Sequence, residues 1–192
     1  MEADRDLGIA LFHAARERWR RDGATGLVPR ASVLLNAVLA EWPDDVTALE
    51  AQAHLLWMRG RTAEARDTFR AGMALEKDNE RLLEGAAALA GATGRRDEAV
   101  ALLGRAAAIN PYCADYPRRL AVLYAEAGQW AESARAARAA LGLDISLTEA
   151  WIALVVAQAR LGDLVGAQHE LRRLRAFDPD AADALRRALF AG

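Results

Sequence analysis

The chain has 192 residues, of which 53% are hydrophobic and 27% charged, and its mean hydropathy is -0.04. This composition is sufficient to bury a core, so an intrinsically disordered chain is excluded. The 25 basic and 27 acidic residues give a formal net charge of -2, which provides no general attraction to nucleic acid or to an anionic membrane. Cys113 is the only cysteine, so neither an intrachain disulfide nor a cysteine-based metal site is expected.

The segment formed by the first six residues is acidic, whereas a secretory signal would begin with basic residues. No uninterrupted apolar run approaches the length of a membrane span. As written, the chain is therefore expected to be cytoplasmic. An extracytoplasmic domain cut from a longer parent would have the same features.

The N-terminal part predicts a long helix over roughly residues 3–22. A loop over 23–29 follows, and a second helix is expected over about 30–41, ending ahead of Pro43 because proline stops one helix and starts the next.

From residue 46 onward one unit is repeated. Glycines recur at intervals of 34 residues, and the units begin at Val46, Glu80, Ala114 and Thr148 without insertions or deletions. The repeated glycines are Gly60, Gly94, Gly128 and Gly162. Three other positions of the unit recur with the same period, and they hold Glu64, Glu98 and Glu132; Ala65, Ala99, Ser133 and Ala167; and Phe69, Leu103, Ala137 and Leu171. The period indicates an array of small units.

Each unit is predicted to be a helix, a short turn and a second helix. In the unit from Val46, apolar residues have helical spacing on both sides of Gly60, which lies where a left-handed residue is needed. Glu64 falls in the first turn of the second helix, where its charge meets the positive helix end. Because such units bury their apolar faces against one another, the array favours a binding surface over a catalytic pocket.

The C-terminal residues 181–190 predict a short helix, with Leu185 and Leu189 on one face and Arg186 and Arg187 on another. The helix is expected to cap the last unit, because a repeat array otherwise leaves a stacking face in water. The alternative is the opening of another repeat in a fragment of a longer chain.

These residues resemble the tetratricopeptide repeat (TPR) family over nearly the whole chain. The matching segments are Gly60 to Ala65 with Phe69; Gly94 to Ala99 with Ala106, Asn110 and Pro111; and Trp151 with Leu154, Gly162, Ala167, Asp178 and Pro179. The chain departs from the family pattern at four positions: Lys77 and Ile145 replace proline, Pro117 occupies the usual tryptophan position, and Gly166 replaces the acidic residue.

The resemblance implies an all-α fold, a right-handed α-solenoid of antiparallel helix pairs with a C-terminal capping helix. It implies a single array over 1–192, with an irregular first repeat over about 1–45, repeats over 46–79, 80–113, 114–147 and 148–181, and a cap over 182–192.

The register of the first repeat stays open between two alternatives. Gly26 is in phase for a unit starting at Phe12, whereas Leu7 and Gly8 resemble the family's Leu-Gly pair and would require an 11-residue insertion before Arg30. Since 11 residues are about three helical turns, both registers present nearly the same face.

No enzymatic motif is present. His13, His54 and His169 lie in different units without metal-ligand spacing, and neither a phosphate-binding loop nor a nucleophile elbow occurs. We expect no catalytic activity, no cofactor and no metal.

By resemblance, the first helix of each unit lines a concave groove that binds partners. The candidate groove residues are Arg16, Arg20, Glu50, His54, Trp57, Met58, Glu84, Ala88, Arg118, Arg119, Val122, Ile152 and Val156. TPR proteins that grip chaperone tails carry Lys and Asn at two of these positions, and no asparagine occurs there in this chain, so that ligand is disfavoured.

The remaining groove is mixed and suits an extended or helical protein segment with apolar anchors, flanked by arginines for its acidic residues. Trp57 either anchors this partner or packs on the neighbouring first helix, His54 is expected to be a polar groove contact, and Trp130 and Trp151 are expected in the core. The alternatives are self-association through terminal helices carrying Trp19, Leu189 or Phe190, and an interaction domain excised from a larger protein. RNA binding is less favoured, and no membrane partner is expected.

Overall fold

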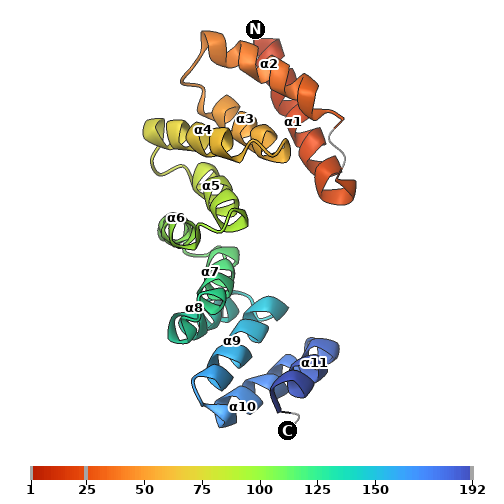
Figure 1. Ribbon diagram of the computed structural model, residues 1–192, viewed down its shortest axis with the longest axis vertical. Coiled ribbons are helices and arrows are strands. Elements are labelled where there is room, and N and C mark those ends of the chain that lie inside the picture. Colours follow the sequence, from red (N-terminus) through yellow and green to blue (C-terminus); the bar gives the residue numbers. More distant parts are fainter. Residues whose placement is uncertain (1, 24–25, 191–192) are drawn as a thin grey trace. The chain divides into compact units, whose positions relative to one another are not determined.

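The computed structural model describes residues 2–23 and 26–190, and every regular element in these ranges is a helix (Figure 1). The elements are α1 (Glu2–Asp22), α2 (Val28–Glu41), α3 (Val46–Met58), α4 (Thr62–Leu75), α5 (Glu80–Ala92), α6 (Arg96–Ile109), α7 (Asp115–Glu126), α8 (Trp130–Leu143), α9 (Thr148–Arg160), α10 (Leu164–Leu174) and α11 (Pro179–Phe190). The all-α helix-pair architecture predicted from the sequence is confirmed.

Glycines with left-handed backbones end the first helices. Gly60, Gly94, Gly128 and Gly162 have φ between 72° and 85°, a region that only glycine enters without strain. Gly23 does the same after α1, with φ 71°.

The loop predicted over 23–29 is shorter than expected. Residues 24 and 25 lie outside the described residues, and Val28 and Pro29 already belong to α2, with Pro29 in its first turn. Proline is favoured there because the first helical N–H groups have no partner within the helix.

The chain divides into two compact units, one over 1–95 and the other over 96–192. In the first unit, α1, α2 and α3 enclose a core that contains Phe12, Val28, Leu35 and Leu55. In the second, α9 and α10 centre a core around Trp151, Leu154 and Leu174. The division falls in the turn between α5 and α6, inside the repeat expected over 80–113.

Helix α11 closes one end of the second unit's core. It packs on α9 and α10, with Ala182 buried and Leu185, Leu189 and Phe190 packed against the same cluster. The helix expected over 181–190 is therefore present and begins at Pro179. The cap prediction extended to 192, and residues 191 and 192 lie outside the described residues.

The contacts of α1 favour one of its two open registers. Between regular first helices, Arg81 reaches Glu50 and Arg118 reaches Glu149, each pair 31 positions apart. Phe12 of α1 instead stacks on His54 of α3, and these two residues are 42 positions apart. This separation exceeds the regular 31 positions by 11 residues. The 11-residue insertion, with Gly8 buried against α2, fits these contacts; the in-phase register does not.

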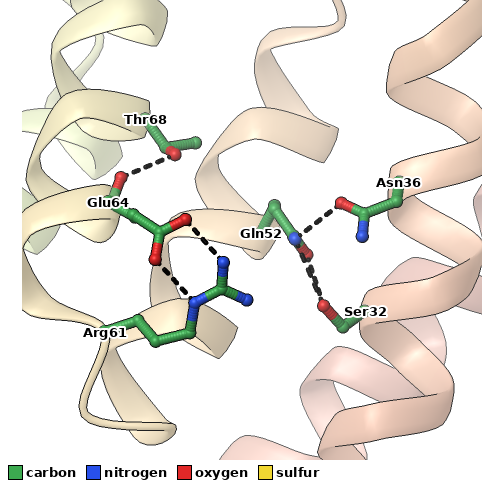
Figure 2. A network of polar contacts seen from close by, with 6 residues as sticks. All are labelled: Ser32, Asn36, Gln52, Arg61, Glu64 and Thr68. Carbon is green, nitrogen blue, oxygen red and sulfur yellow. Dashed lines mark hydrogen bonds and ion pairs between the residues drawn. The ribbon is translucent and has the colours of Figure 1, made fainter.

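Two polar clusters in the first unit differ in burial (Figure 2). Between α2 and α3, Gln52 exchanges hydrogen bonds of 3.2 Å with Ser32 and donates one of 2.8 Å to Asn36. At the start of α4, Arg61 donates to Glu64 at 2.7 Å on the exposed surface. The first cluster joins two helices, whereas the second lies within the first turn of one.

Candidate functional site

One surface of the first unit gathers most of the predicted groove residues. It is formed by the first helices α1, α3 and α5, which pack in sequence against one another. We call it the α1/α3/α5 face and define it by His13, Arg16, Trp19, Arg20, Glu50, His54, Trp57, Arg81, Glu84 and Ala88. Helical spacing explains the grouping, because residues three or four apart share one side of a helix.

Aromatic rings run across this face. His54 stacks on Phe12 with 5.7 Å between ring centroids, meets Phe69 edge-on at 5.1 Å and lies 6.3 Å from Trp57. Trp57 in turn contacts Trp19 of α1 at 6.3 Å, with the rings tilted by 55°. The inner rings belong to the core and the two indoles reach the surface, since Trp57 is half-buried and Trp19 is 37% exposed.

Gly85 provides the space for this ring packing. A Cβ atom at this position of α5 would lie 2.7 Å from the Phe69 ring and 2.9 Å from His54 Nε2. Such distances are too short for unstrained contacts, so only glycine lets α5 approach α3 this closely.

The charged groups of the face converge on α3. Glu50 is 4% exposed, and Arg81 of α5 forms an ion pair with it at 3.0 Å. Burial raises the pKa of Glu50, opposed by the charges of Arg81 and Arg16. Burial, together with the charges of Arg16, Arg20 and Arg81, lowers the pKa of His54 to about 4, so this imidazole is neutral at pH 7.

The predicted residues of the first unit fall into three groups. Glu50 and His54 (8% exposed) are mostly internal, so they organise the face more than they present polar atoms on it. Trp57 packs on α1, which is one of the two expected alternatives, and keeps part of its surface exposed. Arg20 is exposed, whereas Arg16, Glu84 and Ala88 are half-buried.

Met58, another candidate groove residue, is half-buried. It packs against the core between α1, α2 and α3, and with Val28, Pro29 and Arg59 it lines a separate cavity of about 350 Å³. Met58 differs from Trp57 in these contacts because consecutive helical residues point about 100° apart.

The predicted residues of the second unit lie on α7 and α9. Arg118 of α7 donates to Asp115 and to Glu149 of α9, and Arg119 lies 3.8 Å from Asp115. The apolar candidates there are half-buried: Val122, Ile152 and Val156. Arg118, a candidate for binding a partner's acidic residues, thus already forms ion pairs within the second unit.

Sequence reasoning missed two features of the first unit. Trp19 had been considered only for self-association, yet it lies against Trp57. Arg81 had been placed in the groove without its buried partner Glu50. The register of α1 was the missing information for Trp19, and the 31-position spacing between first helices would have been the signal for Arg81.

The described residues hold neither a metal-binding cluster nor a helix that could span a membrane. No group of three or more His, Cys, Asp or Glu side chains in residues 2–23 and 26–190 is arranged to hold a metal ion. Over the same ranges, no helix has the length and hydropathy that a membrane span needs.

Comparison with known proteins gives a match in structure alone. The sequence matches no protein-family model and no curated protein. A solved structure of a mutant form of MamA superposes with a TM-score of 0.79 at 21% identity, covering 98% of this chain and 96% of that chain. YrrB, described as a TPR protein with an unusual peptide-binding site, superposes with a TM-score of 0.75 at 17% identity, covering 92% and 90%.

The chain has the TPR fold. A crystal structure of MamA gives the same result, with a TM-score of 0.76 at 16% identity, covering 99% of this chain and 97% of that one. At such identities the likeness concerns the path of the backbone. The candidate site residues of this chain must therefore be interpreted from their own contacts.

Proposed function

We propose that this chain is a non-enzymatic interaction module that binds a peptide segment of a partner protein on the α1/α3/α5 face. The observation that carries the proposal is the surface indole pair Trp19 and Trp57 beside Arg16 and Arg20. Tryptophan and arginine are the residues most enriched among those that dominate binding energy.

The packing of the face supports a rigid anchor. Trp57 contacts the rings of both Trp19 and His54, so it loses little side-chain entropy when a partner binds. On α5, the small residues Ala88 and Gly91 are half-buried and leave room for a partner's side chains. The description of YrrB as a peptide-binding TPR protein agrees with this use of the fold.

The experiment is selection of phage-displayed random dodecapeptides on the chain, followed by affinity measurement with synthetic peptides. Trp57→Ala should weaken the selected peptides by roughly ten- to a hundredfold, the range of an interface anchor. Tyr112→Ala is the matched control, because Tyr112 is an aromatic side chain of the second unit that is 85% exposed. Unchanged affinity in Trp57→Ala would move the site elsewhere, and the absence of any selected peptide would refute peptide binding.

Self-association is the second candidate function, favoured by the 37% exposure of Trp19. The other end of the chain offers less, because Leu189 and Phe190 pack against the core of the second unit. Sedimentation velocity over a range of concentrations separates the two functions: a monomer throughout eliminates self-association.

A further inference from the structure

We infer that the peptide bound by the α1/α3/α5 face is acidic and inserts an aromatic or large aliphatic side chain beside the two indoles. The inference rests on the proposed function and adds the chemical class of the partner. It depends on the arrangement of charges and rings in the first unit.

The surface end of the face belongs to the C-terminal half of α1. Trp19 and Arg20 lie three and four positions after Arg16, so each of them is a neighbour of Arg16 on the surface of this helix. Trp19 meets Trp57 of α3, and the Arg20 side chain is 56% exposed. Two guanidinium groups therefore flank an exposed apolar surface formed by two rings.

The charges of this face do not cancel within it. Its carboxylates are Glu50 and Glu84, against the guanidinium groups of Arg16, Arg20 and Arg81. Glu50 is buried and already forms an ion pair with Arg81 at 3.0 Å. The charge of Arg16 acts on both Glu50 and His54 of α3.

Arg20 keeps most of its charge available. Its ion pair with Glu17 is long, at 3.9 Å, and both side chains are more than half exposed, so water screens the interaction. His54 is neutral and adds no charge of its own. The face therefore has an excess of positive charge in a chain whose net charge is -2.

An acidic peptide matches this arrangement better than a nucleic acid does. Guanidinium groups bind carboxylates through paired hydrogen bonds, and a neighbouring aromatic pair binds an apolar side chain. A nucleic acid would need a track of basic residues, whereas residues 1–95 contain 13 basic and 15 acidic residues and the available arginines lie at one place.

In the experiment, dodecapeptides are selected on the wild-type full chain and on two double variants, and the selected pools are sequenced. Wild type should enrich Asp and Glu together with Trp, Phe or Leu. The double variant Arg16→Glu/Arg20→Glu should lose this acidic preference and bind a synthetic acidic peptide at least roughly tenfold more weakly. The control Arg18→Glu/Arg21→Glu makes the same change of charge on other sides of α1 and should bind within roughly twofold of wild type.

The outcomes separate this inference from the proposed function. A wild-type pool without acidic enrichment overturns the inference and leaves peptide binding intact, whereas no selected peptide overturns both. If the control variant loses as much affinity for the acidic peptide as Arg16→Glu/Arg20→Glu does, the effect is one of general charge, and the inference is overturned. Displacement of the acidic peptide by micromolar oligouridylate would overturn it as well, by assigning the face to nucleic acid.

Folding of each variant is checked by far-ultraviolet circular dichroism. If Arg16→Glu/Arg20→Glu unfolds, Arg16→Gln/Arg20→Gln takes its place. This neutral variant should lose part of the acidic preference and keep the apolar one, since the indole pair is unchanged. Retention of the full acidic preference would overturn the inference.

Discussion

His54 is neutral because of where its ring lies. Phe12, Phe69 and Trp57 surround the imidazole, and the absence of a side chain at Gly85 leaves room for it. Water is excluded from the ring, and the nearby arginines repel a proton, so the pKa falls from 6.5 to about 4. The burial of His54, which was expected to be a polar groove contact, also links the stability of the first unit to pH.

The stability of the first unit should fall between pH 6.5 and 4 because of His54. The unfolded chain takes up the proton first as the pH falls, so the contribution is fully present above pH 6.5 and is lost toward pH 4. The expected loss is about 2 kcal/mol at pH 5 relative to pH 7. Urea unfolding of wild type and His54→Leu at both values measures it as the difference between the two chains.

Glu50 makes this comparison with His54→Leu necessary. Its raised pKa acts in the opposite direction, since protonation of this buried carboxyl removes a desolvation penalty as the pH falls. Glu50 is present in both chains, so its contribution cancels in the difference. Identical pH profiles for wild type and His54→Leu would show that His54 has no such role.

Single residues were predicted unevenly from the sequence. Trp151 was placed in the core by its repeat position, and it is fully buried. Trp130 was predicted there too and is half-buried, with Arg160 over its ring at 5.7 Å. Glu50 was assigned to the groove, but its buried ion pair involves a helix 31 positions away, which a pattern within one repeat does not contain.

At the scale of helices, α2 and α3 are joined by buried polar groups as well as by apolar packing. Gln52 satisfies Ser32 and Asn36 across the helix interface, and both Ser32 and Gln52 are almost fully buried (Figure 2). Leaving a buried hydroxyl or amide without a hydrogen-bond partner destabilises the fold by more than the net stabilisation that the hydrogen bond provides. The network thus fixes how α2 lies on α3.

Gln52→Ala should destabilise the first unit by about 1–3 kcal/mol, because it removes packing and leaves the buried Ser32 hydroxyl without its partner. Glu64→Ala is the comparison: it removes the exposed ion pair with Arg61 and should leave the melting temperature nearly unchanged. Thermal melts followed by circular dichroism compare the two variants. Equal destabilisation by both would refute the distinction between the buried and the exposed cluster.

On the scale of the whole molecule, each of the two compact units has its own core. The first is centred on α1 to α3, and the second is closed by α11. In a repeat fold each helix pair is stabilised mainly by its neighbours, so a terminal helix contributes through the surface that it covers. Helix α11 covers the end of the core around Trp151.

Removal of residues 179–192 should lower the melting temperature by roughly 5–10 °C, because the apolar side chains of α11 leave the core and expose its end. Thermal melts and light scattering measure the loss and any resulting aggregation. Arg186→Ala/Arg187→Ala alters only exposed residues of α11 and should have little effect. If the truncated chain has the same melting temperature as the wild type, α11 is not a cap.

The helix pairs, the glycine turns and the position of α11 could be predicted from the sequence, because they depend on spacing within about 34 residues and on the backbone freedom of single residues. The register of α1, the partner of Glu50 and the contact between Trp19 and Trp57 are known only from the folded chain. These contacts join helices 31 to 42 positions apart. Their geometry depends on how one helix pair packs on the next, and the repeat pattern does not specify that packing where the first unit departs from it.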